Sequence, residues 1–169
     1  MAQAVHTRHL IEAAGLPVAI VSGAGTGTHA ISGVIEGIDE LQVGSYATMD
    51  AEYASRGGVD FEQALSVLVT VISRPAPHVA IVDAGLKAIT PEFGLPRVLV
   101  EGAEYAEFSE EHGILALSGG AQKMRIGDKI ELVPAHGCTT CNLYDAMHVL
   151  DADDRFVELW QIEGRGMVQ

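Results

Sequence analysis

The spacing of apolar positions changes about one third of the way along the chain. Residues 2–14 are rich in alanine and straight-chain side chains and predict a helix, which ends at Gly15. The continuous apolar run 16–21 predicts a strand buried on both faces in a parallel sheet. Apolar side chains then recur with helical spacing over residues 31–38, and a second short strand is expected at 40–43. This alternation is typical of βαβ units.

From about residue 60 the pattern becomes one of short β-type runs separated by Gly, Pro, Asp and Ser, which predicts an antiparallel sheet curled into a barrel or sandwich. The acidic segment 101–111 has five glutamates and no Lys or Arg, and we interpret it as a solvated surface. The expected strands are 65–72, 79–82, 97–100, 114–117, 129–133, 147–150 and 156–162.

The predicted fold class is therefore an α/β segment followed by a mainly antiparallel β domain. Gly57 and Gly58 form a natural connection, so we place the first part at residues 1–56 and the β domain at 57–169. Two strands cannot close a parallel sheet. The first part is thus expected either to assemble with something else or to end a longer architecture.

Composition and charge narrow the classes of function. At 169 residues and 48% hydrophobic content, the chain can bury an ordinary core. Ten basic against 23 acidic residues give a formal net charge of -13, which disfavours nucleic acid and anionic membrane surfaces as partners. We find neither an apolar run of the ~20 residues needed to span a bilayer nor a secretory signal. With only two cysteines, Cys138 and Cys141, the composition suits a reducing cytoplasm.

Two glycine-containing elements follow the two expected parallel strands. The first, S-G-A-G-T-G-T at 22–28, leads into a helix, and the second is Q-V-G-S-Y at 42–46. Glycines let backbone N–H groups approach an anion, and a helix N-terminus adds a positive dipole. The first element is neither a Rossmann fingerprint nor a Walker loop. As a pair at the carboxyl ends of consecutive strands, the two elements match what the phosphate grip of a βα barrel needs.

A further glycine marks an expected turn. The segment D-A-G-L-K at 83–87 follows a strand, and we expect Gly85 to supply a positive φ there.

The segment V-P-A-H-G-C-T-T-C-N-L-Y-D, residues 133–145, carries the candidate metal chemistry. In an extended backbone His136 and Cys138 would share one face and hold one ion, and imidazole with thiolate favours zinc. Two ligands would leave positions open for water or substrate. A structural zinc knuckle that adds Cys141 and His148, and a C-T-T-C redox pair, are the alternatives, with the catalytic interpretation narrowly ahead.

Seven motifs occur in an order that closely resembles the D-threonine aldolase and D-serine dehydratase family over essentially the whole chain. They are V-S-G-A-G-T-G-T-H, E-L-Q-V-G-S-Y-A-T-M-D, V-I-S-R-P, V-D-A-G-L-K, G-L-P-R-V, S-E-E-H-G and L-V-P-A-H-G-C-T-T-C-N-L-Y-D. The resemblance implies an alanine racemase-like, fold-type III pyridoxal phosphate enzyme, in which a βα barrel precedes a β domain. Residues 1–56 would then be the last βα units of that barrel.

The same resemblance implies roles for individual residues. His136 and Cys138 would be the metal pair of the β domain, holding zinc or another divalent metal beside the cofactor and the substrate hydroxyl. Aldolases of the family typically have an acidic second ligand, so Cys138 favours dehydratase-like chemistry. The residues implied to grip the cofactor phosphate are Gly25, Thr26, Gly27, Gly44, Ser45 and Tyr46.

One departure from the family limits the expected activity. The lysine that anchors the cofactor lies near the family's N-terminus, and Lys87, Lys123 and Lys129 match no such position. We therefore identify no catalytic residue in this chain and expect no catalysis by the chain alone.

The function expected is that of the C-terminal part of a metal-dependent lyase acting on a small D-β-hydroxy amino acid, D-serine, D-threonine or another, in the cytoplasm. A homodimer or association with a missing barrel half is expected. A split lyase completed by a separate chain and a non-catalytic metal-binding β module are the alternatives.

Overall fold

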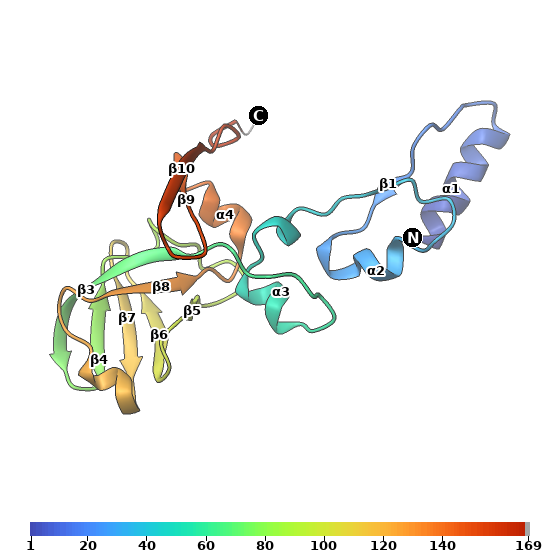
Figure 1. Ribbon diagram of the computed structural model, residues 1–169. Coiled ribbons are helices and arrows are strands. Elements are labelled where there is room, and N and C mark those ends of the chain that lie inside the picture. Colours follow the sequence, from blue (N-terminus) through green and yellow to red (C-terminus); the bar gives the residue numbers. More distant parts are fainter. Residues whose placement is uncertain (168–169) are drawn as a thin grey trace.

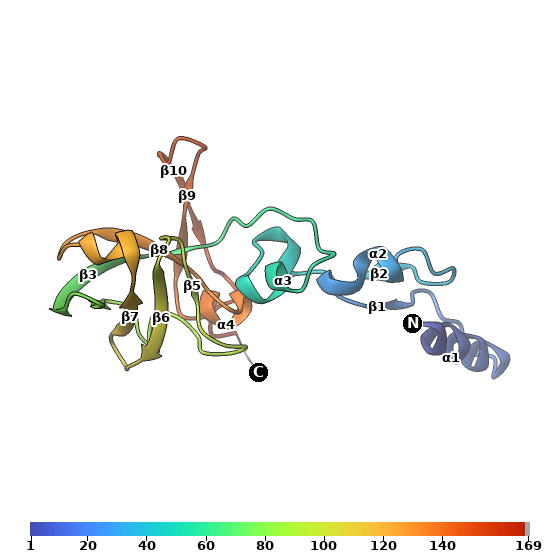
Figure 2. The same cartoon turned by 90° about the horizontal axis from the view of Figure 1, so that it is seen from below.

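The computed structural model describes residues 1–167 and separates an N-terminal α/β arm from a β domain (Figures 1 and 2). In both views α1, β1 and α2 lie apart from the strands β3 to β8, and α3, the last element of the arm, lies next to the β domain. The elements of the arm are α1 (Ala2–Ala13), β1 (Ser22–Gly23), η1 (Thr26–Thr28), α2 (His29–Ser32), β2 (Glu40–Leu41), η2 (Ser45–Ala47) and α3 (Ala51–Ser55).

The arm confirms the βαβ pattern but in a reduced form. Strand β1 pairs with β2 in parallel, with Ser22 opposite Glu40. The strand expected over 16–21 is wrong, because that run has no sheet neighbour within residues 1–167 and Leu16 and Ile20 are 62% and 60% exposed. A buried strand needs neighbours on both sides as well as apolar residues.

The helix expected over residues 31–38 is also shorter than predicted. Helix α2 ends at Ser32, and the glycines that follow it account for the early end. Gly33 is the C-cap, and Gly37 has φ +90°, a left-handed conformation that cannot continue a helix.

The β domain contains one six-stranded sheet and one separate hairpin. Its elements are β3 (Val67–Ala76), β4 (Val79–Val82), β5 (Arg97–Val98), β6 (Ala103–Phe108), β7 (Gly113–Leu117), η3 (Gly119–Lys123), β8 (Lys129–Val133), α4 (Gly137–Cys141), β9 (Ala146–Leu150) and β10 (Phe156–Gln161). The six strands run in the order β5-β8-β3-β4-β7-β6, and every neighbouring pair is antiparallel.

The sheet curls until its two edge strands, β5 and β6, contact each other, which gives a nearly closed barrel. Inward side chains of the strands fill its interior. Val71, Val82, Leu115 and Leu132 are among the fully buried members of this core. The predicted fold class, an α/β segment followed by an antiparallel β domain, is confirmed.

Strand β6 lies within the acidic segment that we interpreted as a solvated surface. That interpretation holds for one face only, since Ala103 and Tyr105 point into the core while Glu104 is exposed. The alternation A-E-Y-A-E-F carried the strand signal. The number of glutamates concealed it.

Arg74 is the residue of the V-I-S-R-P motif that ties the β3–β4 hairpin to the rest of the barrel. Its guanidinium donates to the carbonyl oxygens of Val79 (2.9 Å) and Pro77 (2.7 Å), and to those of Gln122 and Met124. A planar group with five donors suits such a cluster of carbonyls.

The turn at residues 83–87 is present, but the expected positive φ at Gly85 is wrong. Glycine is needed there because of close packing. A Cβ on Gly85 would lie 2.3 Å from the carbonyl oxygen of Ser109 and 2.5 Å from the backbone nitrogen of His112.

The hairpin β9–β10 stands apart from the barrel (Figure 1). All six residues of β10 are exposed, including the apolar side chains Phe156, Val157, Leu159 and Trp160. No helix among residues 1–167 combines the length and apolar character needed to cross a bilayer.

Candidate functional site

The two glycine-containing loops that follow β1 and β2 converge, as the sequence predicted. The backbone N–H of Tyr46, at the second loop, donates to the hydroxyl oxygen of Thr26, at the first, over 3.2 Å. Thr26 is buried. Its side chain therefore holds the loops together and is not free to contact a ligand.

Gly25 and Gly44 leave backbone accessible at this convergence. A Cβ on Gly44 would meet nothing within 4 Å, and one on Gly25 would meet only the carbonyl oxygen of Gln42, at 3.9 Å. Within residues 1–167 the N–H groups of both glycines donate no hydrogen bond. These two groups suit an anion, whereas the N–H of Tyr46 is already engaged.

Aromatic side chains line one side of the convergence. The ring of Phe61, from the connection to the β domain, lies 5.0 Å from the ring of His29 and 5.6 Å from that of Tyr46. His29 also contacts the carbonyl oxygen of Thr26 through Nδ1, at 2.8 Å. His29, to which the sequence assigned no role, thus helps to hold the first loop.

The backbone of the H-x-C motif differs from the extended form that we expected. His136 is extended (φ −132°, ψ 125°) and is the N-cap of α4, so Cys138 lies in the first turn of a short helix. The hydroxyl of Thr140 donates to the carbonyl oxygen of His136 over 2.9 Å and stabilises this turn. A shared strand face is therefore wrong as the reason for pairing the two side chains. Their common metal stays a prediction.

His136 has carboxylates near both ring nitrogens. Nδ1 lies 3.4 Å from Oδ2 of Asp50, and Nε2 lies 3.9 Å from Oε2 of Glu92. The ring of Phe93 packs edge-on against the imidazole, with 4.8 Å between the ring centroids. Nδ1 is buried and has no hydrogen-bond partner, the only such side-chain atom among the described residues.

The loop that carries Glu92 is fixed to α4. The hydroxyl of Thr139 donates to Oε2 of Glu92 over 2.8 Å, and the backbone N–H of Thr90 donates to Thr140 Oγ1 over 3.3 Å. Glu92 is therefore tied to the residue next to Cys138 while it faces Nε2 of His136.

The arrangement fits an open metal site better than a closed one. No group of three or more His, Cys, Asp or Glu side chains in residues 1–167 is placed to hold an ion, which disfavours the structural knuckle with Cys141 and His148. Burial, followed by the charge of Cys138, raises the pKa of the Cys141 thiol, whereas Cys138 is exposed. The imidazole of His136 and the accessible thiol of Cys138 remain the fitting donors.

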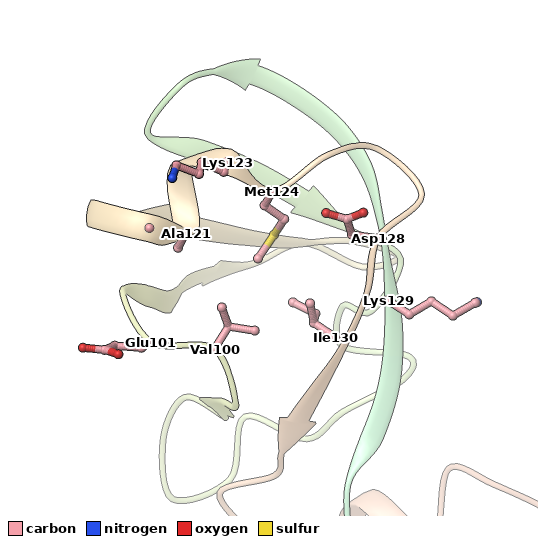
Figure 3. A pocket seen from close by; sticks show the side chains of 9 residues that line it. Val100, Glu101, Ala121, Lys123, Met124, Asp128, Lys129 and Ile130 are labelled. Carbon is pink, nitrogen blue, oxygen red and sulfur yellow. The ribbon is translucent and has the colours of Figure 1, made fainter. Parts of the chain in front are cut away.

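A cavity of about 530 Å³ lies elsewhere on the barrel (Figure 3). Val100, Met124 and Ile130 point into a shared space, while Glu101 and Lys129 point away from it on opposite sides. None of the predicted site residues lines this cavity.

Sequence reasoning missed Asp50, Glu92 and Phe93. Asp50 belongs to the quoted motif E-L-Q-V-G-S-Y-A-T-M-D, but it reaches Gly137 over a separation of 87 residues. Local spacing cannot reveal such a contact.

Comparison with known proteins gives a consistent relationship. Residues 64–150 match the family described as "Putative serine dehydratase domain". The chain is 38% identical to the D-threonine aldolase of Arthrobacter sp over 161 residues, which cover 93% of this chain and 42% of that protein. It is 37% identical to the 3-hydroxy-D-aspartate aldolase of Paracoccus denitrificans over 175 residues, 98% of this chain and 44% of that protein.

Solved structures agree. The D-threonine aldolase from Filomicrobium marinum superposes with a TM-score of 0.91 at 35% identity, covering 98% of this chain and 47% of that one. The metal-free Cys-to-Ala variant of a D-threo-3-hydroxyaspartate dehydratase superposes with a TM-score of 0.80 at 31% identity, covering 95% of this chain and 48% of that one.

The chain spans a little under half the length of these relatives. The match extends over both the arm and the barrel of strands. With its sequence, its fold and its ordered motifs in agreement, the chain belongs to the D-threonine aldolase and D-serine dehydratase family.

Proposed function

We propose that this chain supplies the metal pair and part of the phosphate grip of a pyridoxal phosphate-dependent lyase acting on D-β-hydroxy amino acids. The observation that carries the proposal is the direct contact that links the second phosphate loop to the metal-site segment. Asp50, which contacts the metal-site segment through Gly137, follows the second phosphate loop by only a few residues. The named relatives are aldolases of D-threonine and 3-hydroxy-D-aspartate.

The cofactor phosphate would bind at the convergence of the two loops. Gly25 and Gly44 offer free N–H groups there, and Gly27 and Ser45 flank them on the same turns. Thr26 and Tyr46 would serve by holding the loops together. When bound, pyridoxal phosphate acts as an electron sink for the substrate carbon.

The metal would bind at His136 and Cys138. Solved variants of the D-threo-3-hydroxyaspartate dehydratase replace a histidine and a cysteine that are two positions apart, and the cysteine variant is in the metal-free form. His136 and Cys138 have the same spacing. The pair would hold a Lewis acid where the β-hydroxyl of the substrate lies. Imidazole with thiolate favours zinc, and Cys138 favours dehydration over aldol cleavage.

The remaining part of the catalytic machinery would come from outside these residues. The relatives are about twice as long as this chain, and the cofactor-anchoring lysine would belong to the part that this chain does not span. The exposed side chains of Leu16 and Ile20 support this proposal, since neighbouring strands of a barrel would cover them.

The zinc content of the unmodified chain and of two variants tests the metal site. After purification with zinc, the chain should contain close to one equivalent, and His136→Ala should reduce this to a trace because one of two ligands is lost. Cys141→Ala is the matched control and should change it little, since Cys141 is half-buried and its thiol is disfavoured as a thiolate. Equal loss in both variants would favour a structural zinc site and contradict the proposed open site.

A further inference from the structure

We propose that Asp50 is a positioning residue of the metal pair, which fixes the imidazole of His136 with Nδ1 toward the carboxylate and Nε2 free for the metal. The inference rests on the proposed function for the presence of that metal. The orientation of the ring does not depend on it.

Asp50 is a buried carboxylate with both oxygens engaged. It is 1% exposed. Oδ1 accepts from the backbone N–H of Tyr53 over 2.9 Å, which caps α3, and Oδ2 accepts from the N–H of Gly137 over 3.2 Å. The same Oδ2 lies 3.4 Å from Nδ1 of His136. One side chain thus joins the end of the arm to the start of α4.

The backbone that follows Asp50 is fixed as well. The N–H of Ala51 donates to the carbonyl oxygen of Pro134 over 3.0 Å, and that of Glu52 donates to Ala135 over 3.3 Å. These two acceptors come immediately before His136. Asp50 therefore cannot move away from the imidazole without breaking a double connection between the segments.

The strained backbone of Met49 supports a position of Asp50 that the fold imposes. Met49 is buried and has φ +52°, a left-handed conformation that is costly for a residue with a side chain. Its N–H donates to the carbonyl oxygen of Ser45 over 2.7 Å, so the strained residue links the phosphate loop to Asp50. This unfavourable conformation occurs directly before Asp50, where the backbone turns the carboxylate toward the interior.

A carboxylate at Nδ1 has a specific consequence for metal binding. A carboxylate that accepts a hydrogen bond from Nδ1–H favours the tautomer in which Nε2 carries the free lone pair, and it limits rotation of the ring. Asp50 is closer to Nδ1, at 3.4 Å, than Glu92 is to Nε2, at 3.9 Å. Oε2 of Glu92 also accepts from Thr139 already, so Asp50 is the carboxylate that decides the tautomer. At 3.4 Å the contact is long, and a small rotation of the ring would bring the N–H onto Oδ2. The edge-on contact with Phe93 restricts the ring from another side.

The test uses the full 169-residue chain and the variant Asp50→Asn. Asparagine keeps the volume, is a good N-cap and retains one oxygen for a backbone N–H, so the fold should be kept. Zinc affinity, measured by competition with a chromophoric chelator, should fall about 10- to 100-fold. Asp151→Asn is the control, because Asp151 also accepts two backbone N–H groups (2.9 and 3.0 Å) but at the β9–β10 turn. It should leave the affinity unchanged.

A second measurement needs no metal. Long-range ¹H–¹⁵N correlation spectra, recorded about two pH units above the ordinary histidine pKa, report the tautomer of His136. The wild type and Asp151→Asn should show the proton on Nδ1, and Asp50→Asn should show a mixture. If circular dichroism shows that Asp50→Asn is unfolded, Asp50→Ser, which keeps the α3 cap, replaces it in both measurements.

The outcomes separate this inference from the proposed function. Equal zinc affinity and the same tautomer in wild type and variant would overturn the positioning role. A wild type that binds no zinc would refute the metal site, and the tautomer comparison would then decide the role of Asp50 by itself.

Discussion

Cys138 and Cys141 lie on one short helix in different surroundings. Cys138 is exposed, whereas burial and, second, the charge of Cys138 raise the pKa of the Cys141 thiol. Only the thiolate reacts with alkylating agents, so a raised pKa means slower reaction at neutral pH. The two residues should therefore differ in reactivity although they are equivalent in the C-T-T-C motif.

We predict that iodoacetamide at neutral pH labels Cys138 first and that labelling of Cys141 increases only as the pH rises above the ordinary thiol range. Peptide mass spectrometry after timed quenching measures both sites. Zinc should protect Cys138, and Cys138→Ala should leave only the slow reaction. Equal rates at both cysteines would show that burial does not control them.

Single residues of the site were predictable where their chemistry is local. His136 and Cys138 stand out from spacing and ligand type, and Gly25 and Gly44 from their place after two strands. Asp50 was not predictable, because its contact with Gly137 depends on how the chain folds over 87 residues. Glu92 and Phe93 likewise reach His136 only through the loop that packs on α4.

Elements followed the sequence most closely where apolar residues alternate against a sheet. Strands β4 and β8 have the bounds that the pattern predicted. The strand predicted over residues 16–21 was wrong because a buried strand needs neighbouring strands, and residues 16–21 have none among the described residues. Helix α4 was missed because five residues, G-C-T-T-C, are too few to show a helical period.

At the scale of one element, the turn before β5 depends on the absence of a side chain at Gly85. We predict that Gly85→Ala lowers the free energy of unfolding by about 1–3 kcal/mol or more, as overpacking does, because the Cβ would overlap the backbone of Ser109 and His112. Urea denaturation followed by circular dichroism measures the change. In the control Gly120→Ala the new Cβ meets nothing within 4 Å, and the stability should change little. A stable Gly85→Ala would mean that the 109–112 loop moves away freely.

The whole molecule consists of a well-packed barrel of strands and an arm with much less packing. Helix α1 has no buried residue, and β1 and β2 form a sheet of only two strands. Unpaired strand edges favour association with another chain. A homodimer or a complex with a barrel half would satisfy these edges.

We predict that the chain alone, with pyridoxal phosphate and zinc, releases neither pyruvate from D-serine nor glycine from D-threonine. Catalysis needs a lysine at the cofactor and an oriented base. Together, the proximity and the acid–base catalysis that these groups provide lower the activation free energy by many kcal/mol. Coupled assays measure both products, before and after mixing with a barrel half that carries the lysine. Turnover by the chain alone at about 1 per second or faster would contradict the assignment of the cofactor anchor.

The exposed hairpin β9–β10 contains an intrinsic fluorescence probe. Trp160 is the sole tryptophan of the chain and lies on β10, 54% exposed, among other uncovered apolar side chains. Indole emission shifts to shorter wavelength when water around the ring is replaced by protein. The tryptophan fluorescence of the unlabelled chain therefore follows one surface only, and dilution or mixing experiments can distinguish association that covers this hairpin from association through the arm.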